Sequence, residues 1–372
     1  MTRLTHSSKQ RRLTAEGLEE RRMMAGDVGV EMFGGVLMID GDDLGNAVQV
    51  AKLNNGNLEI RGLSADGGLT RINGGFGAFT VPAANVRGMD INLGDGDDDL
   101  YLNTSAGTTG NRIYLADDLN VRMQGGDDFV KIQNMDIGGE TDVRMDRDPS
   151  SSLAPIGFDF TGGDDRVEVY NSGLGDADFD MGDGDNEVKF GSFYTPYGYA
   201  TWSSTDSLEL TSGDGVDDFD LQNVFASDNL FFSMGGGNDT FDADGLRSYQ
   251  GWTYVNGAAG RDDISLANVT TGRSLVLLGE EGSDEIAVTN GSVGEDMLID
   301  TGDGNDVVAV ENVDVAESLF ADLGDGNDTL GLLRTTAASA ELHGGRNTRF
   351  GQDSLTMTWS RFGSRTTTGW ER

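Results

Sequence analysis

One ten-residue stretch, LGDGNDTLGL from Leu323 to Leu332, constrains the fold most because it recurs with substitutions along most of the chain. The last five steps between copies are each 22 or 23 residues, and three earlier steps are longer because they carry insertions. A fixed period in this range is the mark of a repeat protein whose units stack on one another. The ten copies begin at Leu93, Met123, Phe160, Met181, Thr211, Met234, Gly257, Gly279, Thr301 and Leu323.

Each copy joins a glycine-rich turn to a segment in which apolar residues alternate with polar ones. In one unit, the turn at Gly304 is followed by Val308 and Val310, and Leu319 and Ala321 alternate in the same way before the next turn. Alternation with period two places one set of side chains inside and the other in water. We therefore predict an all-β fold, a right-handed parallel β-helix or solenoid of coils of about 22 residues, with capping segments at both ends.

A second recurring position follows the strand after each turn. Six of the ten copies place Asn two residues beyond that strand, whereas the other four have Thr104, Ser192, Gly245 and Arg334. The position has the parity of the inward residues, so we expect a buried ladder of amides in which each bonds the next, with breaks at the four exceptions. The predicted ladder residues are Asn134, Asn171, Asn223, Asn268, Asn290 and Asn312.

Charge and cysteine content narrow the function classes. The net charge is −38 over 372 residues, which favours binding of cations and disfavours nucleic acid and anionic membranes as partners. The chain has no cysteine, which excludes both a disulfide framework and a thiolate metal site.

The flanking segments lack the repeat. Residues 1–28 are basic and contain no apolar run long enough for a membrane span, so we expect a disordered leader. Residues 29–92 are predicted to form a β cap with a hairpin at Asn55-Gly56, residues 93–340 the solenoid, and residues 341–372 a C-terminal cap.

An inserted loop at 191–204 is rich in aromatic residues that either cover a corner or bind a ligand: Tyr194, Tyr197, Tyr199 and Trp202.

The repeat resembles the haemolysin-type (RTX) calcium-binding nonapeptide, G-G-x-G-x-D-x-U-x, most closely at 235–241, 302–308 and 324–330. One motif occurs here per coil, whereas that family runs its motifs back to back. In the family the glycines expose carbonyls and the aspartate reaches a Ca²⁺ between stacked turns. Carried over, this implies that Ca²⁺ ligands come from Asp98, Asp128, Asp165, Asp217, Asp239, Asp262, Asp284, Asp306 and Asp328, with second aspartates at Asp95, Asp183, Asp303 and Asp325.

Electrostatics gives a separate reason to expect a cation. Carboxylates of stacked turns would lie roughly 5 Å apart and repel by about 3 kcal/mol per pair at an effective dielectric constant of ~20. Oxygen ligands in a flexible turn suit Ca²⁺ better than Mg²⁺. Solvated aspartates that make only turn hydrogen bonds are the alternative.

The segment 18–25, LEERRMMA, resembles the LEPR-XLL signature of large bacterial surface and secreted repeat proteins, with Glu for Pro and Met-Met for Leu-Leu. This resemblance implies export to the cell surface or the extracellular space. The alternative is a terminal tail that is not a sorting signal. We see no recurring cluster of Lys, Arg or His for catalysis, and the two histidines, His6 and His343, lie in the flanking segments.

These observations together predict an exported, non-catalytic, calcium-binding solenoid that acts as a structural or adhesive module at the cell surface or in the matrix. Its partners would be calcium ions, with extracellular polysaccharide or surface proteins as further candidates. The alternative function is a carbohydrate-binding module or a polysaccharide lyase on a β-helix.

Overall fold

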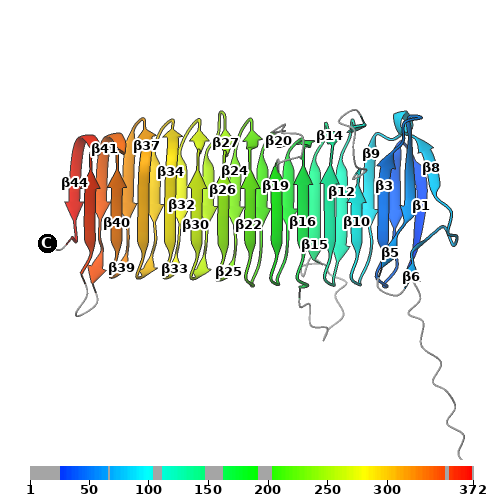
Figure 1. The fold of residues 1–372 in the computed structure, drawn as a ribbon, viewed down its shortest axis with the longest axis horizontal. Coiled ribbons are helices and arrows are strands. Elements are labelled where there is room, and N and C mark those ends of the chain that lie inside the picture. The colour runs from blue at the N-terminus through cyan, green and yellow to red at the C-terminus, as the bar shows by residue number, and fades with distance from the viewer. Residues whose placement is uncertain are drawn as a thin grey trace, which may run out of the picture.

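The computed structural model describes residues 26–65, 68–103, 111–146, 162–191, 203–347 and 352–370. They form a straight rod of stacked coils in which consecutive coils pair in parallel (Figure 1). Leu319 of one coil pairs with Met297 of the coil before it, 22 residues earlier. The predicted parallel solenoid with coils of about 22 residues is therefore confirmed. Residues 1–25 of the predicted leader, 1–28, lie outside the described part of the chain. Its last residues are not disordered, because Asp27 and the buried Val28 begin strand β1 (Asp27–Phe33).

Each coil contributes two main strands, which lie on opposite sides of a thin apolar core. The first follows the glycine-rich turn. These strands are β10 (Asp99–Leu102), β13 (Phe129–Gln133), β16 (Arg166–Tyr170), β19 (Glu187–Gly191), β22 (Asp218–Gln222), β26 (Thr240–Asp244), β30 (Asp263–Ala267), β34 (Glu285–Val293), β37 (Val307–Val315), β40 (Thr329–Leu333) and β43 (Ser354–Thr358).

The second main strand precedes the next turn. These strands are β9 (Gly88–Asn92), β12 (Leu119–Gln124), β15 (Thr141–Asp146), β18 (Ala177–Asp180), β21 (Leu208–Thr211), β24 (Leu230–Ser233), β28 (Thr253–Asn256), β32 (Leu275–Leu278), β35 (Met297–Asp300), β38 (Ser318–Asp322), β41 (Thr336–His343) and β44 (Arg361–Thr368).

Short strands close the two edges of the flattened coil. At the corner edge they are β11 (Ile113–Leu115), β14 (Met135–Ile137), β17 (Gly173–Leu174), β20 (Ser203–Thr205), β23 (Val224–Ala226), β27 (Arg247–Ser248) and β31 (Thr270–Thr271). At the turn edge they are β25 (Gly236–Gly237), β29 (Ala259–Gly260), β33 (Glu281–Gly282), β36 (Asp303–Gly304), β39 (Asp325–Gly326) and β42 (Arg346–Asn347).

Alternating side chains fill the core as the period-two pattern predicts. In β37, Val308 and Val310 are buried, while the alternate residues Val307 and Ala309 are exposed. The same positions in other coils hold Phe219 and Leu221, or Phe241 and Ala243. One apolar column therefore runs through the rod, because each coil covers the inner face of its neighbour.

The N-terminal cap begins the solenoid rather than preceding it. Strand β2 (Val36–Asp40) pairs in parallel with β9, and β3 (Ala47–Lys52) pairs in parallel with β10, so these strands already form a coil. Antiparallel strands cover them: β1 (Asp27–Phe33) on β2 and β4 (Asn57–Gly62) on β3. The β3–β4 pair is the hairpin that the Asn-Gly dipeptide predicts.

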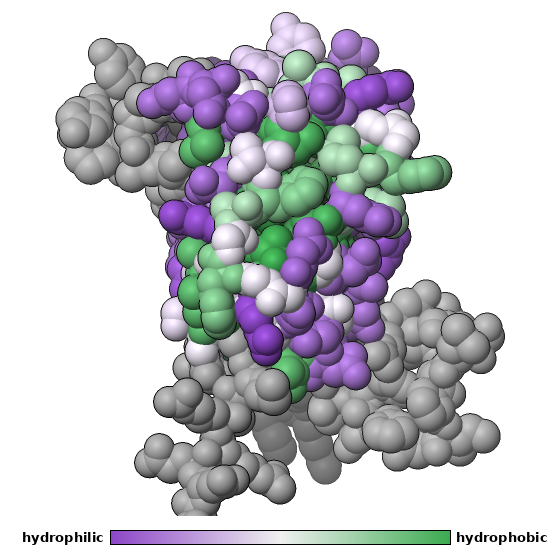
Figure 2. Space-filling model, turned by 90° about the vertical axis from the view of Figure 1, so that its right-hand side faces the viewer, coloured by the Kyte–Doolittle hydropathy of each residue, from purple (hydrophilic) through white to green (hydrophobic). Residues whose placement is uncertain are grey.

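The remaining elements of the cap are short. They are β5 (Ser64–Ala65), β6 (Gly68–Leu69), β7 (Arg71–Ile72), β8 (Phe79–Pro82), which pairs with β4, and a 3-10 turn at Ala83–Asn85. Figure 2 looks onto this end of the rod and shows hydrophobic residues across its middle, with hydrophilic residues mostly around them. The cap replaces the missing previous coil and covers edges that would otherwise be open to pairing.

The C-terminal segment continues the stack. Strand β43 pairs in parallel with β40, and β44 pairs in parallel with β41, in the same register as the coils before them. Residues predicted as a separate cap therefore contribute strands to a further coil. Its inward residues Leu355, Met357 and Phe362 are only half-buried, because no described coil covers them.

Candidate functional site

One row of side chains runs unbroken along the turn edge of the rod, and we call it the turn ladder. In each link the backbone N–H of one member donates to Oδ1 of the member on the next coil, as Asp239 does to Asp262 at 2.9 Å. All members are at most 2% exposed. The turn ladder consists of Asn46, Asp98, Asp128, Asp165, Asn186, Asp217, Asp239, Asp262, Asp284, Asp306, Asp328 and Asp353.

Glycine is required two residues before each ladder aspartate because of how closely the coils approach there. A Cβ on Gly282 would lie 1.4 Å from the carbonyl oxygen of Gly260 on the previous coil, and Gly282 has φ +157°. No side chain fits that space. The repeated glycine therefore allows the stacking distance that lets a ladder carboxylate reach the neighbouring coil.

The second carboxylate oxygen, Oδ2, is buried and meets no donor in the ladder aspartates from Asp98 to Asp328. Within the described residues it has no hydrogen-bond partner in Asp98, Asp128, Asp165, Asp239, Asp262, Asp284 and Asp328. Oδ2 of Asp217 and of Asp306 also has no hydrogen-bond partner, and burial raises the pKa of both carboxyls, although the hydroxyls of Ser212 and Thr301 oppose that rise. Leaving a buried polar atom unsatisfied is costly, and more so when it carries charge.

Two ladder members show what surrounds this position. In Asn186 the amide nitrogen replaces one carboxylate oxygen, and it donates to the carbonyls of Gly182 and Gly184 at 3.3 and 3.1 Å and to Ser212 Oγ at 3.0 Å. In Asn46 the amide nitrogen donates to the carbonyls of Asp42, Leu44 and Leu93 at 3.1, 2.6 and 3.2 Å. The position next to Oδ2 is therefore lined by oxygen acceptors.

The same register places equivalent groups around each ladder aspartate. For both Asn186 and Asn46, two acceptors belong to the residues four and two positions before the asparagine itself. The third belongs to the next coil, five positions before the ladder residue of that coil. Around Asp262 these positions are Ala258, Gly260 and Gly279. A carboxylate there needs either a proton of its own or a cation beside it.

Burial raises the pKa of these carboxyls above the ordinary value for aspartate, although a backbone N–H donated to each one opposes the shift. Neighbouring aspartates raise several of them further by repulsion. The pKa is raised to about 9 in Asp128, about 8 in Asp98 and Asp165, about 7 in Asp239 and Asp328, about 6 in Asp217, Asp262 and Asp306, and above its usual range in Asp284.

The second set of predicted ligands does not join the ladder. Asp183, Asp303 and Asp325 are exposed and Asp95 is half-buried, on the outer surface of the same turns. Asp183 accepts the backbone N–H of Asp214 at 3.0 Å, which links neighbouring coils. Among the described residues, no group of three or more His, Cys, Asp or Glu side chains converges as a metal site. A cation in these turns would therefore depend on backbone carbonyls as much as on carboxylates.

The corner asparagines point the opposite way from the prediction. Asn268, Asn290 and Asn312 are exposed, not buried, because each has a positive φ of 54–58°. That left-handed conformation turns the chain and breaks the alternation on which the prediction rested; Asn tolerates it well. Amide-to-amide bonds do join some of them, as from Asn312 Nδ2 to Asn290 Oδ1 at 2.7 Å.

The other three corner asparagines, Asn134, Asn171 and Asn223, also have positive φ and are half-buried. Two of the predicted breaks, Gly245 and Arg334, share the conformation at φ 83° and 52°, so the corner continues through them. Thr104 and Ser192 lie outside the described residues. So do Tyr194, Tyr197, Tyr199 and Trp202 of the aromatic insertion.

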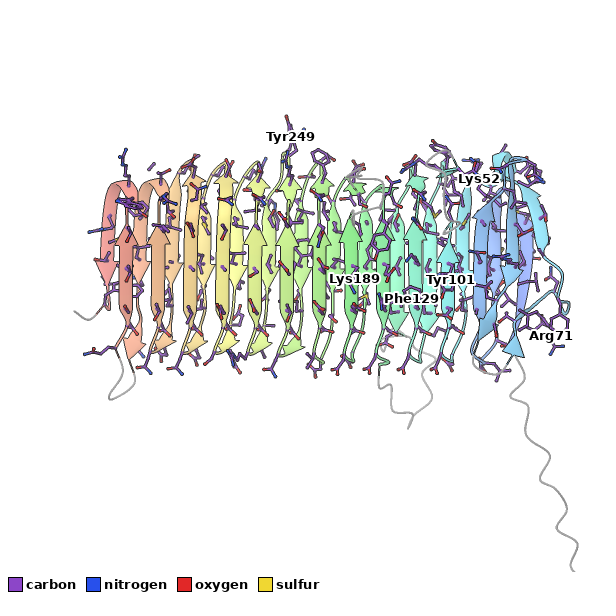
Figure 3. All side chains as sticks on the ribbon, in the orientation of Figure 1. Lys52, Arg71, Tyr101, Phe129, Lys189 and Tyr249 are labelled. Atoms are coloured by element: carbon purple, nitrogen blue, oxygen red, sulfur yellow. The ribbon has the colours of Figure 1, made fainter. Side chains whose placement is uncertain are left out.

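Basic side chains gather on the outer face of the first coils. Lys131 and Lys189 occupy equivalent positions two coils apart, with Glu168 between them. Figure 3 shows Lys189 with the aromatic residues Tyr101 and Phe129 on this face. Lys131 pairs with Glu168 and Lys189 pairs with Glu187.

Arg166 completes this cluster. It pairs with Glu168 and Glu187 and lies over the ring of Phe129, with its guanidinium carbon 5.6 Å from the ring centroid. Burial opposes ionisation of Glu168, but Lys131 and Arg166 outweigh it and lower the pKa of that carboxyl. The arrangement links neighbouring coils through ion pairs.

No protein-family model, curated protein or solved structure matches this chain. No helix of the described residues is long and apolar enough to span a membrane.

Proposed function

We propose that this protein is an exported, non-catalytic β-solenoid whose glycine-aspartate turns bind Ca²⁺, serving as a rigid structural or adhesive module at the cell surface or in the matrix. One observation carries the proposal: the Oδ2 atoms of the ladder aspartates from Asp98 to Asp328 are buried without a donor. The asparagine copies indicate that oxygen acceptors line the same position. A cation between carboxylate and carbonyl oxygens would satisfy both at once.

The donor set favours calcium over other metals. Carboxylates, carbonyls and an occasional hydroxyl are hard oxygen ligands, and the turns contain no histidine or cysteine for zinc or copper. Ca²⁺ accepts irregular oxygen coordination, whereas Mg²⁺ requires a near-octahedral set. When bound, the ion would neutralise the ladder carboxylates and cross-link adjacent coils. Export, implied by the N-terminal resemblance, would expose the rod to calcium outside the cell.

A protonated ladder is the competing occupant of the same position. The raised pKa values would allow several ladder carboxyls to keep a proton near neutral pH, and Oδ2–H could then donate to a carbonyl. The two readings differ in their response to calcium. Only the cation reading expects stability to rise with added Ca²⁺ at a pH where the carboxyls would ionise.

We expect no catalysis because the clustered cations are engaged in ion pairs with Glu168 and Glu187. Depolymerisation of an acidic polysaccharide by the purified full-length protein would contradict this part of the proposal.

The test is thermal unfolding of the full-length protein, followed by far-ultraviolet circular dichroism at pH 8, in EGTA, in millimolar Ca²⁺ and in millimolar Mg²⁺. We expect a large rise in the midpoint with Ca²⁺ and a much smaller one with Mg²⁺. Isothermal titration calorimetry gives the number of ions. Identical curves in all three conditions would contradict the proposed role of calcium.

A second candidate function, carbohydrate binding, is favoured by an aromatic group on the outer surface of β23, β24, β27 and β28. Tyr249 is 71% exposed and projects from the corner edge of the rod (Figure 3), and Trp252 is 39% exposed. Trp252 meets Tyr254 edge-on, with centroids 6.4 Å apart, and Tyr249 lies 6.1 Å from Phe225. Exposed aromatic faces of this kind stack on sugar rings.

Neighbouring rings limit where a sugar could bind. Phe231 and Tyr254 stack on each other, 4.8 Å apart and 2° from parallel, so each covers a face of the other. Tyr249 and Trp252 are therefore the residues to test on a glycan array, using Tyr249→Ala and Trp252→Ala. Tyr114→Ala, at a separate exposed tyrosine, is the control. A signal lost only in the first two variants supports this candidate; no signal from the unmodified protein contradicts it.

A further inference from the structure

Asn46 and Asn186 occupy the same register position as the ladder aspartates but complete their turns in a different way. The ladder runs through Asn186 without interruption: Asp165 N–H donates to its Oδ1 at 3.0 Å, and its own N–H donates to Asp217 Oδ1 at 2.9 Å. Asn186 therefore performs the structural role of an aspartate in the stack. What differs is the second polar atom of the side chain.

In these two turns the amide nitrogen supplies the donors that the acceptor-lined position requires. Asn186 Nδ2 lies within 3.3 Å of two carbonyl oxygens and one hydroxyl oxygen, and Asn46 Nδ2 lies within 3.2 Å of three carbonyl oxygens. Both side chains are at most 1% exposed. A cation placed among the same oxygens would collide with the amide hydrogens and meet like charge.

The position of Asn186 gives this difference a consequence for the whole rod. It separates three ladder aspartates on its N-terminal side, Asp98, Asp128 and Asp165, from those that begin at Asp217. Asn46 closes the row at the cap, where β2 and β3 form the first coil. Every described ladder position between these two asparagines, and beyond Asn186, holds an aspartate.

We infer that Asn186 is a built-in substitute for the bound cation. It divides the calcium-binding row into two stretches and keeps the central turn of the rod formed when calcium is withdrawn, and Asn46 does the same at the cap. The inference rests on the proposed function, because it assigns which turns take calcium and which do not. It also means that exchanging Asp and Asn at one ladder position converts one kind of turn into the other.

The experiment uses the full-length protein and three variants. Asn186→Asp creates an aspartate turn, Asp262→Asn creates an asparagine turn, and Asn290→Asp makes the same charge change at an exposed corner outside the ladder. Calcium stoichiometry is measured by equilibrium dialysis with atomic absorption, using Ca²⁺ alone as the probe. Thermal midpoints are measured in EGTA and in Ca²⁺ at pH 8.

We expect Asn186→Asp to bind one more calcium than the unmodified protein and to melt several degrees lower in EGTA. Asp262→Asn should bind one calcium fewer and melt higher in EGTA, so it tests the inference even if Asn186→Asp does not fold. Asn290→Asp should leave the stoichiometry unchanged.

Two failures are distinguishable. An unmodified protein that binds no calcium would overturn the proposed function. Calcium binding by the unmodified protein, with an unchanged count in both Asn186→Asp and Asp262→Asn, would overturn this inference alone. A midpoint in EGTA that falls in Asp262→Asn would also overturn it, because the amide would then not satisfy the turn.

Discussion

The two edges of the flattened coil use similar residues for opposite purposes. At the turn edge, aspartates such as Asp262 are buried, and the side chain bonds the backbone of the neighbouring coil. At the corner edge, asparagines such as Asn290 are exposed, and the residue is present for its backbone conformation, with φ 58°. The side chain therefore matters most at one edge, and the main-chain torsion at the other.

Glycine substitutions should show the largest difference in stability between the two edges. Gly282→Ala at the turn edge would place Cβ 1.4 Å from a carbonyl oxygen, so we expect a loss of about 3 kcal/mol or more, or no folding. Gly245→Asn at the corner introduces a residue that tolerates φ 83°, and its Cβ would meet no atom closer than 3.1 Å. We therefore expect the free energy of unfolding to change by about 1 kcal/mol or less. Urea unfolding measures both. Equal losses would contradict the contrast.

Removal of the side chain should sharpen the comparison on a smaller scale. Asp262→Ala leaves the buried N–H of Asp239 without its acceptor, at a cost of about 1–3 kcal/mol in calcium. Asn290→Gly keeps the left-handed corner and loses one exposed amide bond, so the expected cost is about 0.5–1 kcal/mol. The same unfolding assay applies. A larger loss in Asn290→Gly would show that the corner side chains matter more than their exposure indicates.

The pH dependence of stability should also belong to the turn edge. Folding raises the pKa of the ladder aspartates, so without calcium their contribution is fully present below the unfolded value near pH 4. It declines as the pH rises through the folded values of about 6 to 9. Thermal midpoints in EGTA should therefore fall from pH 5 to pH 9.

A matched pair of variants tests the origin of this slope. Asp262→Asn removes one buried titrating group and should flatten the decline, whereas Asp303→Asn removes one exposed carboxylate and should change it far less. Equal effects of the two variants would assign the slope to general surface repulsion, not to the ladder.

The sequence predicted the stack because the period and the alternation both depend on local chemistry. Val308 and Val310 point inward as expected, and Gly304 and Asp306 take the turn positions that the repeat assigned to them. The corner asparagines were placed wrongly because a single left-handed residue such as Asn312 reverses the parity that alternation counts. Nothing in the residue type alone distinguishes that use of asparagine from a buried amide.

Two ladder members lie outside the ten repeat copies and were not predicted as ligands. Asn46 stands in a degenerate turn, GDDLGN, within the segment predicted to form the N-terminal cap, and Asp353 follows a longer link. The pairing of β3 with β10 and of β40 with β43 brings both into the ladder. The burial of the ladder could not be predicted either, because it depends on how closely glycines allow the coils to approach.

The most direct measurement of the central claim is anomalous diffraction from crystals of the full-length protein grown with calcium, recorded at a long wavelength where calcium scatters anomalously. We expect peaks beside Oδ2 of the ladder aspartates, such as Asp262 and Asp284, and none beside Asn46 or Asn186. Aspartate turns without peaks at saturating calcium would contradict the account and would identify the ladder as a row of protonated carboxyls.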